Sequence, residues 1–171
     1  MTSSAYGPRT AATAVTRITN MKIRPTRADD VGALSRVLDA TQLFPAAMLP
    51  DMLSGHLAGE SPDLWLTCEN DGEPVGFCYA APEALTDGAW NMLAIAILPE
   101  RQGSGVGSAV VAHLEAALRE RGVRILIADT SGTDAFARTR AFYAGNGYEE
   151  AARIRDFWAA GDDKVTFRKA L

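Results

Sequence analysis

The length and composition are those of a folded protein with a single core. The chain has 171 residues, of which 47% are hydrophobic and 22% charged, and these are ordinary values for one globular domain. The net charge of −4 disfavours a nucleic-acid-binding protein, because such proteins usually carry a basic stripe. The longest apolar runs, such as Met92–Leu98, are far shorter than the roughly 20 residues that a membrane-spanning helix needs. We therefore expect binding to neither nucleic acid nor membrane.

Residues 1–20 show no periodicity, and we predict that they form a poorly ordered N-terminal extension. They are rich in Ala, Thr and Ser and contain no acidic residue. Targeting peptides have similar chemistry, but the apolar segment of a secretory signal is missing here. We therefore expect a domain over residues 21–171 and a cytoplasmic protein. Cys68 and Cys78 are then expected to be reduced core thiols, and no Cys/His group has the spacing of a metal site.

The first predicted elements are a strand and two helices. Residues 21–24 alternate between apolar and basic side chains, as in a half-buried strand. Asp29 or Asp30 can cap a helix, because apolar residues recur at helical spacing at positions 31, 34, 37 and 38. Apolar positions 48, 52, 53 and 57 predict a second helix. It should begin near Pro45 or Pro50, since proline fits a first helical turn.

Three strands are predicted next. Leu64–Glu69 and Pro74–Ala81 flank Asn70-Asp71-Gly72, whose residues tolerate the positive φ angles of a tight hairpin turn. Trp90–Leu98 is almost wholly apolar, so we expect both of its faces to be covered.

The rest of the chain predicts helices alternating with strands. A long helix has apolar positions at 106, 110, 114, 117 and 118 and ends at Gly122. A strand over Arg124–Asp129 and a helix over Ala135–Asn146 follow, and residues 148–154 and 164–170 read as two final strands. This order favours an α/β fold in which helices cover both faces of a central sheet.

A glycine-rich turn before the long helix is the most informative segment. Gly103, Gly105 and Gly107 leave the backbone uncovered, so that N–H groups can converge on one point. These are the unpaired donors at the positive end of a helix dipole, which predicts an anion site best suited to phosphate. The turn lacks the Gly-Lys-Ser/Thr of a P-loop and comes too late for a dinucleotide fingerprint. A turn that only caps the helix is the alternative.

Two motifs resemble those of a known family. Gln102-x-x-Gly105-x-Gly107 resembles the Gln/Arg-x-x-Gly-x-Gly/Ala signature of the GCN5-related N-acetyltransferases (GNAT). Arg140–Tyr148 resembles the family's Phe-Tyr-x-x-x-Gly-Phe/Tyr segment. The resemblance covers roughly residues 21–171. It implies a mixed central sheet of about six to seven strands with helices on both faces.

The resemblance also implies an activity. The protein would move an acetyl group from acetyl-CoA to a primary amine by direct attack in a ternary complex. The amine would belong to a small molecule, an amino acid or a protein N-terminus, and a longer acyl donor would need only a different pocket. A non-catalytic acyl-CoA-binding sensor or interaction module on the same fold is the alternative.

The resemblance assigns acetyl-CoA contacts to a strand and to the glycine-rich turn. The strand would pair its backbone with pantetheine, the turn would hold the pyrophosphate, and the glutamine that opens the motif would fix the turn. The residues are Ile95, Ala96 and Ile97 on the strand, followed by Gln102, Gly103, Ser104, Gly105, Val106, Gly107 and Ser108.

The acid and the base are assigned less directly. Tyr143 matches the family tyrosine near the thioester sulfur, where a phenol can protonate the departing thiolate; a core tyrosine is the alternative. Many members carry a glutamate where this chain has Asn91, and a neutral amide cannot accept a proton. Asp129, at the end of the next strand, is the candidate base, or else a residue that caps a loop. Glu83, Asp87 and a chain of water molecules are further options.

Other positions have two interpretations each. Phe136 replaces a frequent family Asn and can stack on pantetheine or pack inside, while Arg138 and Arg140 can reach cofactor phosphates or solvent. Asp162-Asp163 can attract a cationic amine or form a solvated turn. Several apolar residues can line the acceptor groove, join the core or form the contact of a homodimer, which is a frequent assembly in the family: Phe44, Met48, Met52, Phe157 and Trp158.

Overall fold

The computed structural model describes residues 20–171. The extension predicted over residues 1–20 therefore lies outside the described residues, apart from Asn20. Within the described part, seven strands form one sheet: β1 (Met21–Pro25), β2 (Leu64–Asn70), β3 (Glu73–Pro82), β4 (Ala89–Ile97), β5 (Ile125–Ser131), β6 (Glu149–Ala159) and β7 (Asp162–Ala170). The same residues form four α-helices: α1 (Val31–Thr41), α2 (Leu49–Ala58), α3 (Val106–Glu120) and α4 (Ala137–Gly145).

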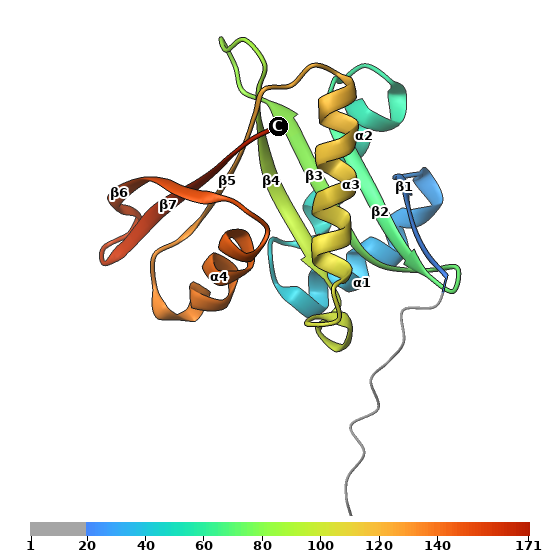
Figure 1. Cartoon of the computed structure of the whole chain (residues 1–171). Helices are drawn as coiled ribbons and strands as arrows, with labels where there is room; N and C mark the ends of the chain where they lie inside the picture. Colours follow the sequence, from blue (N-terminus) through green and yellow to red (C-terminus); the bar gives the residue numbers. More distant parts are fainter. Residues whose placement is uncertain (1–19) are drawn as a thin grey trace, which may run out of the picture.

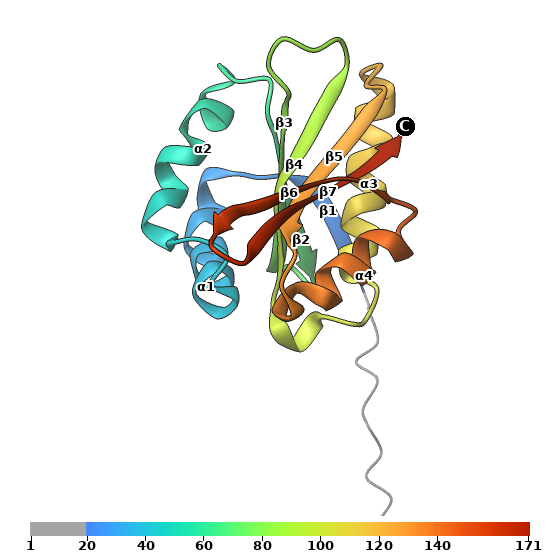
Figure 2. The same ribbon diagram turned by 90° about the vertical axis from the view of Figure 1, so that its left-hand side faces the viewer.

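The sheet is mixed, and helices cover both of its faces. Its strand order is β1-β2-β3-β4-β5-β7-β6. The β4–β5 pair is parallel, whereas all other neighbours are antiparallel. Helices α1 and α2 lie on one face and α3 and α4 on the other (Figures 1 and 2). The predicted fold class is confirmed.

Each face of the sheet has its own hydrophobic core. Under α3 the core includes Val110, Leu114 and Leu126, which are completely buried. Under α1 and α2 it includes Leu34, Trp65 and Phe77, also completely buried. Cys68 and Cys78 lie in the first core as free thiols, as expected. Burial raises the pKa of the Cys68 thiol to about 11, with a further contribution from the charge of Glu69.

The pairing of β4 with β3 contains an irregularity. The pairing of β4 with β3 shifts between Tyr79 and Ala80, which leaves Leu93 as an extra residue. Met92 consequently faces the α3 core while Ala94 faces the α1/α2 core, although residues two apart normally share a face. The prediction that both faces of this strand are covered is wrong at Leu93, which is 53% exposed.

Strands β4 and β5 pair over only three residues and then separate. Asn91, opposite Ile127, is the last paired residue of β4. The rest of β4 therefore has a neighbour on the β3 side alone. This opening between β4 and β5 leaves backbone groups of β4 free for a ligand.

The C-terminal hairpin is longer than predicted. β6 continues to Ala159, so Phe157 and Trp158 belong to a strand and not to a loop. Both side chains are about half exposed. All residues of β6 are exposed, and this strand lies at the edge of the sheet. The pairing of β6 with β7 is irregular between Ile154 and Ala159. The sequence pattern therefore did not predict the second half of β6.

A buried ion pair joins β1 to the start of α1. Arg24 donates to both oxygens of Asp30 at 2.7 Å and also pairs with Glu69. The Asp30 carboxylate also accepts the backbone N–H of Arg27, so it does not cap α1 as predicted and instead closes the short turn before that helix. Separately, no helix within residues 20–171 has the length and apolar character needed to cross a membrane.

Candidate functional site

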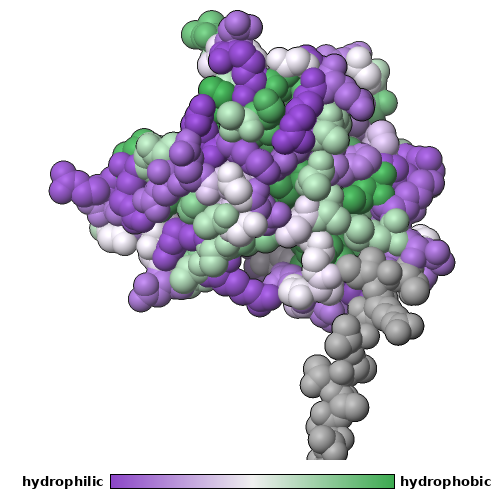
Figure 3. All heavy atoms as spheres, in the orientation of Figure 1, coloured by the Kyte–Doolittle hydropathy of each residue, from purple (hydrophilic) through white to green (hydrophobic). Residues whose placement is uncertain are grey.

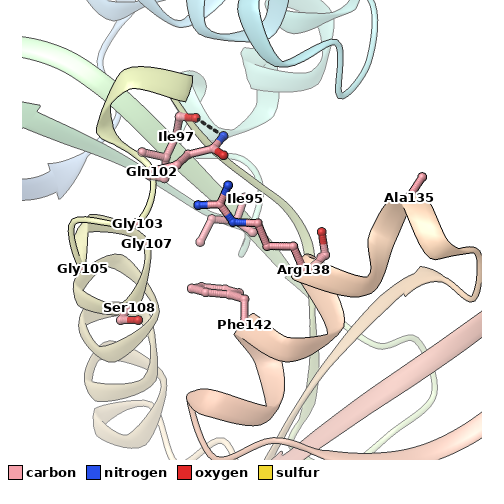
Figure 4. Close-up of a pocket in the computed structure, with 11 residues that line it drawn as sticks. Ile95, Ile97, Gln102, Gly103, Gly105, Gly107, Ser108, Ala135, Arg138 and Phe142 are labelled. Carbon is pink, nitrogen blue, oxygen red and sulfur yellow. Dashed lines mark hydrogen bonds between the residues drawn. The ribbon is translucent and has the colours of Figure 1, made fainter.

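A cleft of about 540 Å³ lies between the start of α3, the end of β4 and helix α4. Such a volume is typical of a small-molecule site. Figure 4 shows the side chains that line the cleft, together with the glycine backbone of the turn. They are Ile95, Ile97, Gln102, Gly103, Gly105, Gly107, Ser108, Ala135, Arg138, Thr139 and Phe142.

The glycine-rich turn presents uncovered backbone to this cleft. Gly103 and Gly105 have φ angles of +74° and +90°, which only glycine adopts without strain. The first backbone hydrogen bond of α3 runs from the Ala109 N–H to the Gly105 carbonyl. The N–H groups that precede it have no acceptor within the helix. A Cβ atom built on Gly105 would meet nothing within 4 Å, so the space beside this backbone is open.

Two hydrogen bonds shape the turn. Gln102 Nε2 donates to the carbonyl of Ile97 at 2.9 Å, and Ser104 Oγ donates to the carbonyl of Arg101 at 2.6 Å. The first bond ties the start of the turn to the end of β4 (Figure 4). This geometry suits the predicted role of Gln102 in fixing the turn.

Alternate residues of β4 face the opening. The Leu98 N–H donates to Val75 of β3, and backbone groups reverse direction at each residue of a strand. The backbone of Ala96 therefore also points toward β3, whereas that of Ile95 and Ile97 points away from β3, into the opening. Of the three predicted contacts on this strand, Ile95 and Ile97 line the cleft and Ala96 does not.

Helix α4 supplies the opposite wall of the cleft. Arg138 reaches across it, since its Nη2 would lie 3.3 Å from a Cβ built on Gly103 (Figure 4). Phe142 packs on Gly107, where a Cβ would come within 3.2 Å of its ring. A cation and a row of free N–H groups thus face each other, which is the chemistry of a phosphate site.

Sequence reasoning missed most of this wall. Among its residues, only Arg138 was considered. Ala135, Arg138, Thr139 and Phe142 recur at i, i+3, i+4 and i+7, the spacing of one helix face. That spacing could have predicted a shared helix face. It does not form an apolar stripe, because three of the four residues are small, polar or charged.

Tyr143 is buried beside the cleft and not within its lining. It is 4% exposed and packs against Tyr148 and Phe167, with ring centroids 5.8 and 5.4 Å away. Burial raises the pKa of its phenol well above the ordinary value, and the nearby Cys78 and Asp129 add to the effect. The phenol therefore remains protonated at neutral pH, as an acid must.

Asp129 has both carboxylate oxygens engaged. Thr166 Oγ1 donates to Oδ1 at 2.6 Å, and Lys164 Nζ lies 2.7 Å from Oδ2. Both oxygens are thus occupied by partners within the protein, and neither is left free for an acceptor amine. The arrangement is that of a structural ion pair between β5 and β7.

Asn91 is held by one of the other candidate carboxylates. Its Nδ2 donates to Glu83 Oε1 at 2.8 Å. Asp87 contributes its backbone instead, since its carbonyl accepts from Nε of Arg124 at 3.0 Å. The structure therefore brings Glu83, and not the Asp87 carboxylate, to the last paired residue of β4.

The remaining predicted residues separate into core, surface and scaffold. Phe44 packs on Phe77, whereas Met48 and Phe136 are exposed. Arg140 donates to two backbone carbonyls, those of Ser131 and Thr133, at 2.8 and 2.7 Å, and so braces the loop before α4.

The two acidic residues of the last turn also have partners within the protein. Asp162 accepts from the Ser131 hydroxyl at 2.6 Å. Asp163 accepts from the Asp156 N–H at 3.1 Å and pairs with Arg153.

Comparisons with known proteins agree on one family. The profile of the acetyltransferase (GNAT) domain matches residues 61–150. The aminoglycoside N(6′)-acetyltransferase type 1 of Stenotrophomonas maltophilia is 31% identical over 125 residues, which cover 66% of this chain and 76% of that protein.

Solved structures share the fold. A protein from Desulfovibrio desulfuricans assigned to the GNAT family superposes with a TM-score of 0.80 at 30% identity, over 88% of this chain and 98% of its own. The PaiA N-acetyltransferase of Thermoplasma acidophilum, solved in complex with coenzyme A, has a TM-score of 0.71 at 14% identity. That match covers 90% of this chain and all of the other.

Proposed function

The chain belongs to the GNAT family of acetyltransferases, and from this premise we propose that it transfers the acetyl group of acetyl-CoA to a primary amine of a small molecule, by direct attack in a ternary complex. The observation that carries the proposal is the glycine-rich turn at the start of α3. Its open backbone faces Arg138 across a cleft of suitable size.

The turn and the strand hold the donor. The N–H groups from Gly103 to Ser108 and the guanidinium of Arg138 bind the pyrophosphate. The backbone of Ile95 and Ile97 pairs with the amides of the pantetheine arm, as an added strand would. Phe142 forms the apolar floor beside Gly107. Most of the rate enhancement then comes from holding the thioester against the amine.

The chemistry needs an oxyanion donor and an acid. The Ile95 N–H, directed into the opening, stabilises the charge that develops on the acetyl oxygen. The amine nitrogen forms a bond to the carbonyl carbon, and the carbon–sulfur bond breaks. Tyr143 gives its proton to the departing thiolate, and the proton lost by the amine restores the phenol. Asp129 is a weak candidate for the base, because Thr166 and Lys164 occupy both of its carboxylate oxygens.

The acceptor class is drawn from the relative at 31% identity. That protein is named for acetylating an aminoglycoside at its 6′-amino group. We therefore expect a small amine with further cationic groups. The test is a steady-state assay of thiol release with acetyl-CoA and a panel containing a 6′-amino aminoglycoside, free amino acids and an N-terminal alanine peptide. Turnover on the aminoglycoside supports the proposal. Tight coenzyme A binding without turnover on any amine would instead identify a binding module.

The donor site has a matched test in α3. Gly105→Ala should raise the Kd for coenzyme A at least about tenfold, because its Cβ projects beside the phosphate-binding backbone. Gly122→Ala, at the other end of the same helix, is the control. Both glycines have positive φ and open surroundings, so both variants should lose about 1–2 kcal/mol of stability. Equal Kd values in the two folded variants, measured by calorimetry, would refute the donor assignment.

A further inference from the structure

The closed end of the β4–β5 opening carries a side-chain pair that the proposed reaction does not use. Asn91 is the last residue of β4 that pairs with β5. Its side chain lies on the α1/α2 face, because Trp90 and Met92 on either side of it belong to the core under α3. It is only 8% exposed. A polar side chain this deeply buried requires a partner.

That partner satisfies only half of the amide. Asn91 Nδ2 donates to Glu83 Oε1 at 2.8 Å, whereas Asn91 Oδ1 is fully enclosed and has no hydrogen-bond partner among residues 20–171. The opposite orientation of the amide would set its oxygen against the carboxylate. A buried acceptor without a partner lowers the stability of the fold. The Asn91 side chain therefore destabilises the protein at Oδ1, while its Nδ2 holds the Glu83 carboxylate in place.

The loop before β4 fixes Glu83 from the other side. The Glu83 N–H donates to the Ala89 carbonyl at 2.9 Å, and Thr86 Oγ1 donates to the Glu83 carbonyl at 2.9 Å. The Arg124 N–H donates to the Gly88 carbonyl at the end of the loop. Asn91 is the single described partner of the Glu83 carboxylate. The half-buried carboxylate is therefore held in place with Oε2 left for another donor.

Other charges near this end favour a cation. Tyr79, on the same face of β3, donates its hydroxyl to Asp63 Oδ2 at 3.1 Å, which places a second carboxylate on this side of the sheet. The Arg124 side chain donates to the carbonyl of Asp87, and Lys164 is paired with Asp129. Both cations therefore have partners other than Glu83. The β3–β4 loop, at the top of Figure 3, carries both hydrophilic and hydrophobic side chains, and Leu85 within it is fully exposed.

We propose that Glu83, positioned by Asn91, binds a second, unreacting ammonium group of the acceptor. The proposal rests on the proposed function, because Ile95 marks where the acetyl group is held. Asn91 lies four positions before Ile95 in β4, so their backbones are at most about 13 Å apart at the rise of an extended strand. The acceptor class is thus a polyamine or amino sugar whose reacting amine and second ammonium lie about that far apart.

The test compares α,ω-diamines of increasing length with monoamines of equal length. For wild type, the ratio of kcat/KM for diamine to that for monoamine should rise to about 10–100 as the diamine approaches roughly 13 Å, the range expected of a charge-assisted hydrogen bond. Glu83→Gln and Asn91→Leu should each reduce that ratio to about 1, and the double variant should reduce it no further. Glu73→Gln, at the opposite end of β3, should retain the wild-type ratio. High salt should lower the ratio in wild type and in Glu73→Gln, and should leave it unchanged in Glu83→Gln and Asn91→Leu.

The outcomes separate this inference from the proposed function. A flat ratio in wild type, no turnover of long diamines, or a wild-type ratio in Glu83→Gln overturns the ammonium site. Turnover of any amine in those same assays leaves the acetyltransferase proposal standing. The melting temperature and the Kd for coenzyme A are measured on each variant. Wild-type values of both show that a reduced diamine-to-monoamine ratio does not result from unfolding or from weaker donor binding.

Discussion

At the scale of single residues, burial decides which groups can exchange protons. Tyr143 is enclosed by Tyr148 and Phe167, and its burial, with Cys78 and Asp129 nearby, raises the pKa of its phenol. A phenol with a raised pKa stays protonated at neutral pH, so it can donate a hydrogen bond to the sulfur as the thiolate departs. Asp129 differs from Tyr143, because Lys164 and Thr166 engage both of its carboxylate oxygens.

Tyr143→Phe should lower kcat about 100-fold and leave the Kd for coenzyme A unchanged, since the proposed binding contacts come from the glycine-rich turn, Arg138 and β4. Because the folded-state pKa lies above the ordinary value of about 10, the acid stays protonated through neutral and mildly alkaline pH. Wild-type kcat should therefore show no loss from this group below about pH 10. Tyr148→Phe is the control, since that hydroxyl bonds Glu115 at 3.1 Å in the core. An equal loss of kcat in both variants would assign Tyr143 to packing.

At the scale of elements, two helices that are distant in sequence line one cleft, which is the proposed anion site. The start of α3 supplies unpaired N–H groups, and one face of α4 supplies Arg138 and Phe142. Gly107 couples the two helices, because a side chain there would strike the Phe142 ring at 3.2 Å. Glycine is therefore required at these two positions for different reasons. Gly105 has a positive φ angle and leaves the backbone accessible, whereas Gly107 allows the Phe142 ring to pack against the backbone.

Arg138→Gln should weaken coenzyme A binding about tenfold, because a charge-assisted hydrogen bond to phosphate is lost. The salt dependence of binding should also become shallower. Arg155→Gln, on the exposed strand β6, removes the same charge away from the cleft and should leave the Kd at its wild-type value. The measurement is calorimetric titration at several salt concentrations. Identical salt slopes for wild type and Arg138→Gln would show that the guanidinium does not touch the ligand.

At the scale of the whole molecule, a buried ion pair fastens the first strand and the first helix to the sheet. Arg24 is 8% and Asp30 3% exposed. Burial alone would raise the pKa of Asp30, but the hydrogen bonds from Arg24 and the Arg27 backbone, with the charge of Arg24, bring it below its usual value. A lowered folded-state pKa means that the ionised carboxylate stabilises the fold above the unfolded pKa of about 3.9. That stabilisation is lost as pH falls through the folded value.

Asp30→Asn should therefore be strongly destabilised at pH 7, by about 3–5 kcal/mol, because Arg24 loses its buried partner. The difference from wild type should shrink below about pH 4, as the wild-type carboxylate also becomes protonated. Urea unfolding at a series of pH values measures this difference. Asp39→Asn, on the exposed side of α1, is the control and should track wild type. A difference that stays constant from pH 7 to pH 3 would contradict the linkage.

The sequence by itself determined the order of elements, a central sheet with helices on both faces, and the position of the glycine-rich turn. Local physics is sufficient there, because apolar periodicity fixes strands and helices and only glycine accepts the φ angles at Gly103 and Gly105. The tertiary structure alone decided which side chains meet. It set α4 opposite the turn, engaged Asp129 with Lys164, buried Arg24 against Asp30 and placed Glu83 on Asn91. Each of these contacts joins residues from different segments of the chain, as does the pairing of β4 with β5 that ends early, and such pairings leave no periodic trace in a single sequence.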